Sequence, residues 1–431
     1  MIVRRLRTSW RPILIATALL TAGCHATPPS SGASPVAVSP AAPPITPSAA
    51  ETSILPHTPD DQSADDPINH VIAISIDGLN PRAIEELGKS RTPAFHRLMR
   101  EGACTLNART VREETSTTPN HTTMLTGRRV DARHGGHGYT ENFDNGSTIH
   151  KAAGHYVASV FDVVHDHGGS TAFFGAKSKF RLYKRTWNTS GAPDRVGPND
   201  GRAKIDRFTI DRNNTRLVSK FTVDLRRNPR DFTFVHLSLP DRAGHASGFM
   251  GPQYLDAVTR TDRLVGRILN AVADRPDVRR HTLVILTADH GGRGGGSHYR
   301  ASKLQNFRIP FMAWGPGVTA GRNLYSLNPT FRSPGSSRTS YHGKQPIRNG
   351  DLANLATDAL TCLVFRARSS TVPAPSIFFV NGPVSRRRHP LLGSRSLRTA
   401  YTSPDRSSLV GKAPKILIMA PGSSQVRPAH R

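Results

Sequence analysis

Three aspartates and three histidines follow the ends of short apolar segments of this sequence. They are Asp77, Asp241, His245, Asp289, His290 and His298. Taken singly, an aspartate at a strand end is usually a turn former or helix cap, and a lone histidine is usually structural. Six such residues at one place would repel one another unless a cation lay between them. Mixed carboxylate and imidazole ligands suit Zn²⁺, with Mn²⁺ or Mg²⁺ as alternatives that prefer more oxygen, so the set predicts a divalent metal site.

A run of hydroxyl side chains offers a nucleophile. Residues 115–118 read Thr-Ser-Thr-Thr, and Pro119 follows them. Proline is favourable at the first position of a helix, so we expect a helix over 121–130 that begins beside these hydroxyls. The helix dipole favours an anion at that end, and a bound metal would lower the pKa of the hydroxyl much further. The alternative is an ordinary Ser/Thr N-cap, which is the common meaning of this pattern.

Short apolar runs alternate with amphipathic segments along the chain. The apolar runs lie at 71–76, 171–174, 232–239, 282–286 and 309–314. Runs of this length indicate strands that are buried on both faces, as in a largely parallel sheet. Helical patterns lie at 83–99, with a break at Pro93, and at 254–272. This alternation predicts an α/β sandwich, in which ligands bind beyond the carboxyl ends of the strands, where the aspartates and histidines fall.

The composition is strongly basic, but it does not indicate a nucleic-acid partner. The 431 residues carry a formal charge of +27. Part of this charge lies before Cys24 and part lies in 381–431, and the rest is spread through the body of the chain. The sequence lacks the block of aromatic and basic residues that an RNA-binding sheet requires. We therefore interpret the charge as a general attraction for anions, with no specific nucleic-acid partner.

The N-terminus resembles a bacterial secretory signal. Arginines precede an apolar stretch at 13–22 that is too short to span a membrane as a mature helix. Small residues then precede Cys24, as in a lipoprotein box whose cysteine becomes the lipidated first residue. Ordinary signal cleavage with an incidental Cys24 is the alternative. We expect an exported protein of the bacterial cell envelope, anchored to a membrane through this lipid and facing the periplasm or the exterior.

The order of the motifs resembles that of the alkaline phosphatase superfamily. The motifs are Asp77, Thr-Thr-Pro-Asn-His at 117–121, Pro-Asp-x-x-Gly-His at 240–245, Asp-His-Gly-Gly at 289–292, and His298 ahead of Phe-Met-Ala-Trp-Gly-Pro-Gly at 311–317. Within that superfamily they resemble the type I phosphodiesterase/nucleotide pyrophosphatase branch, and the resemblance covers residues 69–380. It implies a three-layer α/β/α sandwich with a largely parallel central sheet.

The resemblance also implies a role for each residue. Thr117 would be the nucleophile, and Thr118 stands where the branch has an aromatic residue, so Ser116 and Thr118 remain alternatives. Asn120 would hydrogen-bond a non-bridging phosphoryl oxygen. The two metal-binding sets would be Asp77, Asp289, His290 and the Thr117 oxygen, and Asp241, His245 and His298. Two metals roughly 4 Å apart would stabilise the attacking and leaving oxygens, and water would hydrolyse the resulting phosphothreonine.

Superfamily membership does not determine the substrate. The segment that begins at Cys104 does not match the Cys/Ser-x-Pro-x-Arg motif of sulfatases, so sulfatase activity is not expected. Lys177 and Lys179 follow the run 171–174 and look similar to the Lys-x-Arg pair that binds phosphate oxygens in some alkaline phosphatases with a threonine nucleophile. Such a pair would favour a monoester dianion over a diester monoanion. The alternative is that both lysines are solvated surface residues, so the ester preference stays open.

These interpretations divide the chain into four parts. They are a signal peptide at 1–23, a Pro/Ser/Ala-rich tether at 24–68, an alkaline phosphatase-like catalytic domain at 69–380 and a basic tail at 381–431. The tether and the tail carry too little apolar surface to fold, so we expect both to be disordered. Cys104 and Cys362 either pair or lie apart as small core residues, and the sequence leaves both options open.

The sequence therefore predicts an enzyme that hydrolyses small phosphate esters with two metal ions and a covalent phosphothreonine. One alternative is a phospho-group transferase that acts on envelope lipids or polymers. Transferases of that kind usually carry several membrane spans, for which this sequence shows no segments. The other alternative is a non-catalytic lipoprotein that binds polyanions, but such a module has no use for six metal ligands and Thr117.

Overall fold

The structure, a computed structural model, describes residues 67–194 and 201–360 of the chain. The predicted signal peptide, the lipidation site Cys24, the tether up to residue 66, Cys362 and the basic tail lie outside the described residues.

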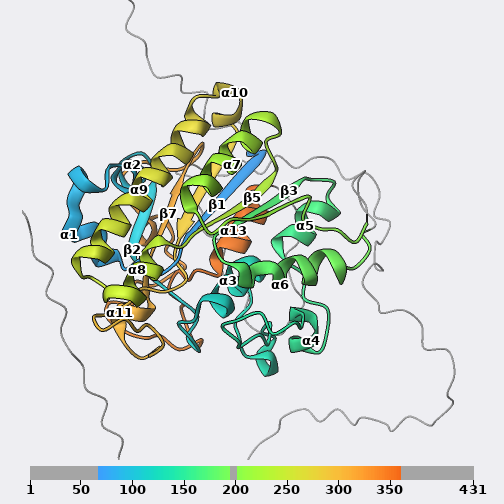
Figure 1. Ribbon diagram of the computed structural model, residues 1–431, viewed down its shortest axis with the longest axis horizontal. Coiled ribbons are helices and arrows are strands. Elements are labelled where there is room, and N and C mark those ends of the chain that lie inside the picture. The colour runs from blue at the N-terminus through green and yellow to red at the C-terminus, as the bar shows by residue number, and fades with distance from the viewer. Residues whose placement is uncertain (1–66, 195–200, 361–431) are drawn as a thin grey trace, which may run out of the picture. The chain divides into compact units, whose positions relative to one another are not determined.

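The described residues form an eight-stranded sheet with the order β4-β3-β5-β1-β6-β7-β2-β8 (Figure 1). The strands are β1 (His70–Ile76), β2 (Ala103–Arg109), β3 (Thr171–Gly175), β4 (Arg207–Ile210), β5 (Phe232–Leu237), β6 (Thr282–Thr287), β7 (Arg308–Trp314) and β8 (Arg322–Asn323). Neighbours from β4 to β6 pair in parallel, and β7 is antiparallel to both β6 and β2. The expected largely parallel sheet is therefore confirmed, with β7 running against its neighbours.

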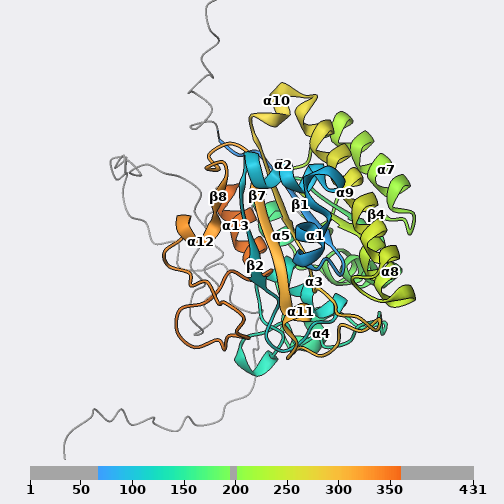
Figure 2. The same cartoon turned by 90° about the vertical axis from the view of Figure 1, so that its left-hand side faces the viewer.

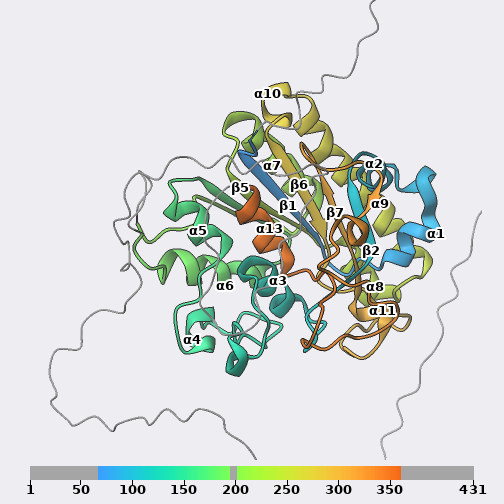
Figure 3. The same ribbon diagram turned by 180° about the vertical axis from the view of Figure 1, so that it is seen from behind.

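Helices cover both faces of this sheet, as Figure 2 shows from the side and Figure 3 from behind. One layer contains α1 (Pro81–Arg91), α2 (Pro93–Glu101), α7 (Asn214–Arg227), α8 (Leu239–Ser247) and α9 (Pro252–Ala273). The other contains α3 (Thr117–Thr126), α5 (Val160–Asp166) and α13 (Asp351–Ala359). Shorter helices are η2 (Ala132–His134), α4 (Ile149–Ala153), η3 (Ser178–Phe180), α6 (Arg181–Lys184), η4 (Arg185–Thr189), α10 (Pro276–Arg279), α11 (Leu304–Phe307) and α12 (Leu324–Leu327). The expected three-layer α/β/α sandwich is confirmed.

The five expected strands are all present, because each apolar run is buried on both faces of the sheet. β1 lies between β5 and β6 and is buried from Val71 onward. β5 ends at Leu237, two residues before its expected end, since Leu239 and Pro240 already belong to the first turn of α8. Proline is tolerated there because the first N–H groups of a helix have no partner within it.

The helix at the hydroxyl run is displaced from its expected position. α3 begins at Thr117 rather than at residue 121, so Pro119 is its third residue and not its first. It ends at Thr126 rather than at 130, because Gly127 adopts a left-handed conformation with φ of 65°. The expected break at Pro93 is confirmed, since α1 and α2 are separate helices. No helix within 67–194 or 201–360 is long and apolar enough to cross a membrane.

Candidate active site

The six predicted ligands lie together at one edge of the sheet. Asp77 follows β1, Asp289 and His290 follow β6, and α8 carries Asp241 and His245 one helical turn apart. His298 lies between β6 and β7. Because β7 is antiparallel to β6, its beginning, and not its end, lies at the carboxyl edge of β6. The direction of β7 therefore explains how a residue ahead of a strand joins residues that follow strands.

These residues divide into two groups with the spacing of metal ligands. In each group one atom from every residue lies within 4.8 Å of the others. The groups are Asp77, Asp289 and His290, and Asp241, His245 and His298. They coincide with the two ligand sets that the sequence motifs imply. Five of the six residues are buried, and the His245 side chain is 36% exposed.

Gly78 allows the three chain segments to approach this closely. Its φ is +71°, and a Cβ atom at this position would lie 2.9 Å from the Cα of Asp241. Its N–H also donates to Oδ1 of Asp289 at 3.0 Å. A larger residue would be strained in this conformation and would push α8 away from β1.

Four buried atoms of this cluster have no hydrogen-bond partner within the described residues. They are Oδ1 of Asp77, Oδ1 of Asp241, Oδ2 of Asp289 and Nε2 of His290. Oδ1 of Asp77 and Oδ2 of Asp289 lie 3.4 Å and 3.3 Å from Nε2 of His290, and Oδ1 of Asp241 lies 3.3 Å from Nε2 of His245. Without hydrogen bonds these buried oxygens need a protonated histidine or a metal ion to offset their charge. All four are lone-pair donors of the kind that bind divalent cations. The residues at this edge therefore fit a pair of metal ions.

The histidines are held in the tautomer that a metal requires. Nδ1 of His290 donates to the carbonyl of Gly291 at 2.8 Å, and Nδ1 of His298 donates to the carbonyl of Thr115 at 2.6 Å. In its neutral form each ring therefore has its lone pair on Nε2. Nε2 of His298 lies 3.1 Å from Nε2 of His245. Backbone bonds of this type fix the ring orientation of metal-binding histidines.

Burial and mutual repulsion shift the pKa values at this edge. Burial, together with the nearby Asp77 carboxylate, raises the pKa of Asp289 to about 8. Burial alone would lower the pKa of His290, but the surrounding carboxylates outweigh it and raise that pKa to about 9. Burial and the charge of His290 lower the pKa of His298 to about 3, so its ring is neutral. Asp289 and His290 thus retain their protons at neutral pH unless a bound cation displaces them.

Lys177 connects the two ligand groups. Its ammonium lies 2.6 Å from Oδ2 of Asp77 and 2.6 Å from Oδ2 of Asp241. It also lies 3.5 Å from the hydroxyl of Thr117. Burial would raise the pKa of Asp77, but Lys177 and the neighbouring histidines outweigh it and hold that pKa well below its usual range. With 16% of its side chain exposed, Lys177 is not the solvated surface residue of the alternative interpretation.

Lys179 lies against the beginning of α3. Its ammonium donates to the carbonyl of Asn142 at 2.7 Å and to Oδ1 of the same residue at 2.9 Å. The Asn142 Oδ1 in turn accepts the N–H of Thr118 at 3.1 Å. Burial and the charge of Lys177 lower the pKa of Lys179 to about 8. Lys179 thus holds a loop against the helix that carries the predicted nucleophile, and its contact with substrate stays a prediction.

Thr117 is the first residue of α3 and is buried beside Lys177. Ser116 is the N-cap of this helix, but its side chain makes no capping hydrogen bond. The Thr118 hydroxyl is buried without a hydrogen-bond partner within the described residues. Among the three candidate nucleophiles, Thr117 has its hydroxyl beside the Lys177 ammonium. Lys177 in turn pairs with Asp77 of one ligand group and with Asp241 of the other.

Both the nitrogen and the oxygen of the Asn120 side-chain amide form hydrogen bonds. Its Nδ2 donates to the carbonyls of Glu114 and Ser116, each at 3.1 Å. Its Oδ1 accepts the N–H of Val111 at 3.2 Å and Nδ2 of Asn349 at 2.9 Å. Asn120 thus holds the segment that leads to Thr117, and a phosphoryl contact would require one of its two donor bonds to be exchanged.

Two buried histidines behind the site do not appear among the predicted residues. Nδ1 of His236 accepts the N–H of Ala176 at 3.1 Å, so its Nε2 carries the proton that is donated to Oδ2 of Asp77 at 2.9 Å. Nδ1 of His121 donates to the carbonyl of Thr117 at 2.8 Å and lies 3.5 Å from Oδ2 of Asp289. His236 could have been noticed as a fully buried imidazole within the largely apolar strand β5.

Curated relatives of this chain include two phosphate transferases. GPI ethanolamine phosphate transferase 1 of Mus musculus is 24% identical over 296 residues, which are 63% of this chain and 29% of that protein. The enzyme of the same name from Yarrowia lipolytica is 29% identical over 122 residues, which are 27% of this chain and 13% of that protein. The chain thus spans less than a third of the length of either relative.

Solved structures with a similar arrangement come from two groups of enzymes. Murine ectonucleotide pyrophosphatase/phosphodiesterase 5 in an inactive form with AMP gives a TM-score of 0.49 at 13% identity, over 72% of this chain and 97% of that one. A putative sulfatase from Bacteroides thetaiotaomicron gives 0.47 at 14% identity, over 71% and 73%.

Residues 71–307 match the family model described as type I phosphodiesterase/nucleotide pyrophosphatase. Both TM-scores lie below 0.5, so the family assignment rests on this sequence match. The match covers more than half of the chain and includes all six residues of the two ligand groups. This protein therefore belongs to the type I phosphodiesterase/nucleotide pyrophosphatase family.

Proposed function

We propose that this protein hydrolyses small phosphate esters with Thr117 as nucleophile and two divalent metal ions at the carboxyl edge of the sheet. The observation that carries the proposal is the set of four buried ligand atoms without hydrogen bonds, which belong to two groups of three residues. The mixture of aspartate and histidine favours Zn²⁺ over Mn²⁺ or Mg²⁺. Export and anchoring through Cys24 belong to the proposal on the strength of the sequence pattern alone.

In this proposal the chain positions the reacting groups. The Thr117 oxygen forms a bond to phosphorus as the bond from phosphorus to the leaving-group oxygen breaks, and water later cleaves the phosphothreonine. The N-terminus of α3 and the ammonium of Lys177 favour negative charge at this position. When bound, the divalent metals supply Lewis-acid stabilisation of the attacking and leaving oxygens. His236 and Lys177 keep the Asp77 carboxylate ionised and oriented.

The proposal is tested by comparing p-nitrophenyl phosphate with bis-p-nitrophenyl phosphate on the purified zinc-loaded protein, before and after chelation and dialysis. We expect cleavage that disappears with the metal and returns when zinc is added. Faster cleavage of the monoester would identify a phosphatase, and faster cleavage of the diester a phosphodiesterase. Absence of metal-dependent cleavage of either ester would overturn the proposal. Salt-sensitive binding of polyanions without turnover would then favour the non-catalytic alternative.

A phospho-group transferase is the second candidate, because both curated relatives are named as ethanolamine phosphate transferases. The first half of the reaction would be the same, and an alcohol would replace water as the acceptor of the phosphoryl or phosphodiester group from Thr117. The candidates separate when ethanolamine or glycerol is added and the ratio of transferred to hydrolysed product is measured. If this product ratio is well above the molar ratio of alcohol to water, the enzyme prefers the alcohol as acceptor, which supports transfer. A product ratio at or below that molar ratio supports hydrolysis.

A further inference from the structure

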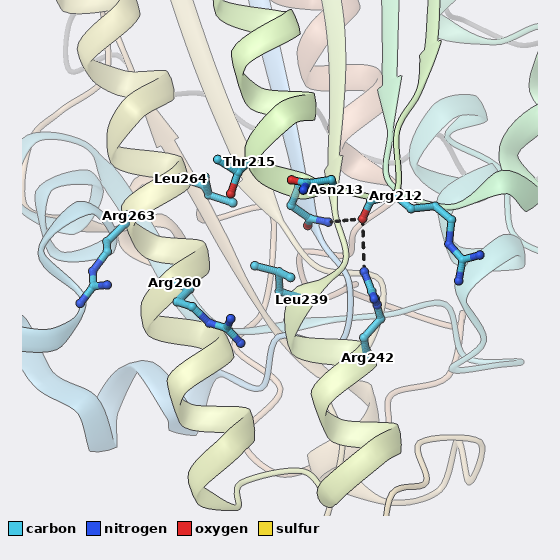
Figure 4. A pocket seen from close by; sticks show the side chains of 9 residues that line it. Arg212, Asn213, Thr215, Leu239, Arg242, Arg260, Arg263 and Leu264 are labelled. Atoms are coloured by element: carbon cyan, nitrogen blue, oxygen red, sulfur yellow. Dashed lines mark hydrogen bonds between the residues drawn. The ribbon is translucent and has the colours of Figure 1, made fainter.

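A cavity of about 390 Å³ lies on the outer side of α7, α8 and α9 (Figure 4). Four arginines line it: Arg212, Arg242, Arg260 and Arg263. Leu239 and Leu264 contribute apolar surface between them. Figure 4 shows Arg242 and Arg260 on opposite sides of Leu239, whereas the side chains of Arg212 and Arg263 extend away from it.

The positive charge of this cavity is poorly neutralised. Among residues 67–194 and 201–360, Arg212, Arg242 and Arg263 form no ion pair, and Arg260 pairs with the exposed Asp256 at 3.0 Å. An anion between Arg242 and Arg260 would therefore add neutralisation that the described residues largely lack.

Nearby carboxylates are already engaged elsewhere. Asp211, which precedes Arg212, accepts hydrogen bonds from Arg216 and Lys220. Asp262, which precedes Arg263, is buried and accepts the N–H groups of Ala94 and Phe95 in α2. Both acids thus form their hydrogen bonds with groups outside the cavity.

The backbone holds one of the arginines in place. Nη1 of Arg242 donates to the carbonyl of Arg212 at 3.2 Å, and Nδ2 of Asn214 donates to the same carbonyl at 3.3 Å. These bonds join α8 to the segment that enters α7. They use one of the five N–H groups of the Arg242 guanidinium, so the others remain available to a ligand.

The cavity is separate from the catalytic edge, although one helix contributes to both. Asp241 and His245 of α8 belong to the metal-ligand groups, whereas Leu239 and Arg242 of the same helix line the cavity. Asp241 is 3% exposed and its neighbour Arg242 is exposed, so these consecutive residues face different sides of the helix.

We infer that this cavity is a binding site for a phosphate-bearing anion, independent of the catalytic centre. The planar guanidinium group matches pairs of phosphate oxygens, and Arg242 and Arg260 present two such groups from different helices. A soluble oligophosphate and the headgroup of an anionic phospholipid share this chemistry. The inference does not depend on the proposed hydrolase activity.

The test is calorimetric titration of metal-free, full-length Thr117→Ala protein with pyrophosphate, so that neither turnover nor bound metal contributes. The double variant Arg242→Gln/Arg260→Gln in this background should bind about a hundredfold more weakly, because each lost charge-assisted pair costs about tenfold. Arg267→Gln is the matched control, since Arg267 is an exposed arginine of α9 that bonds Ser219 and does not line the cavity. Equal losses in control and double variant, or no loss in either, would overturn the assignment.

A parallel arm identifies the source of the phosphate. The same proteins are sedimented with phosphatidylcholine vesicles that contain or lack phosphatidylglycerol. Arginine-dependent binding of pyrophosphate alone supports a soluble ligand, and arginine-dependent binding of the phosphatidylglycerol vesicles supports a lipid headgroup. Absence of arginine-dependent binding in both arms refutes the site.

Discussion

Thr115 and His298 are joined by two reciprocal hydrogen bonds, although 183 residues separate them in the chain. The Thr115 hydroxyl donates to the His298 carbonyl, and Nδ1 of His298 donates to the Thr115 carbonyl at 2.6 Å. The pair fastens the segment that leads to Thr117 to the loop that carries a predicted metal ligand. This pair of hydrogen bonds thus helps to position both the predicted nucleophile, Thr117, and the predicted metal ligand, His298.

We predict that Thr115→Val lowers metal affinity about tenfold, because the loss of a bond that orients a metal ligand usually costs this much or more. Zinc titration against a chelating indicator measures the effect. Thr357→Val is the control, since the buried Thr357 hydroxyl also donates to a carbonyl, that of Ala353 at 3.1 Å, but lies in α13 away from the ligand groups. An equal loss in the control would attribute the effect to general destabilisation.

Removal of the Thr117 hydroxyl should abolish turnover while metal binding persists. We expect the kcat of Thr117→Ala to fall by at least about a thousandfold, as for other lost nucleophiles, whereas Thr118→Ala retains most activity. Ester hydrolysis and metal content by mass spectrometry are measured on the same samples. Loss of activity in Thr118→Ala with retention in Thr117→Ala would move the nucleophile by one residue.

The two lysines should differ in their effects. Lys177→Met removes the cation beside Thr117, so kcat/KM for a monoester dianion should fall about a hundredfold and for a diester monoanion about tenfold. Lys179→Met removes the hydrogen bonds that hold Asn142 against α3, so the activity toward both esters should fall by the same factor. Steady-state kinetics on the two p-nitrophenyl esters tests this. A selective monoester loss in Lys179→Met would instead make Lys179 a substrate ligand.

The buried carboxyl of Asp351 predicts a pH-dependent stability. Burial raises its pKa from the ordinary 3.8 to about 7, so the folded state binds this proton more tightly than the unfolded state does. Its contribution to the free energy of unfolding is therefore present at low pH and is lost as the pH rises through about 4 to about 7. In Asp351→Asn the amide oxygen can still accept the Arg348 N–H, which donates to the Asp351 carboxylate at 2.7 Å.

Urea unfolding at several pH values between about 5 and about 8 should show a flatter profile for Asp351→Asn than for the wild type. Asp358→Asn, an exposed change in the same helix, serves as the control and should leave the profile unaltered. A wild-type profile without a decline across this range would contradict the assignment to Asp351.

The sequence predicted the central strands because an apolar run that is buried on both faces leaves a clear signal, as in β1 and β6. It missed β2, β4 and β8, which are short or contain polar residues and depend on their neighbours for pairing. Hydropathy also carries no information on strand direction, so the antiparallel β7 could not be foreseen. The start of α3 was misplaced because proline is tolerated anywhere in the first turn.

The ligand groups were predictable because the motifs retain their order and residue types. The position of Lys177 between Asp77 and Asp241 was not, since it depends on three strand ends meeting in space. The hydrogen bonds from Lys179 to Asn142 could not be predicted either, because the spacing of these residues in the sequence gives no sign of the contact.

α8 presents Asp241 to the metal-ligand groups and Arg242 to the arginine-lined cavity, so both sites share one short helix. Thermodynamic linkage then makes any coupling between the two sites reciprocal. If an anion at Arg242 alters the affinity for metal at Asp241, metal alters the affinity for that anion by the same factor. A comparison of the pyrophosphate affinity of metal-loaded and metal-free protein therefore measures the coupling free energy between the two sites.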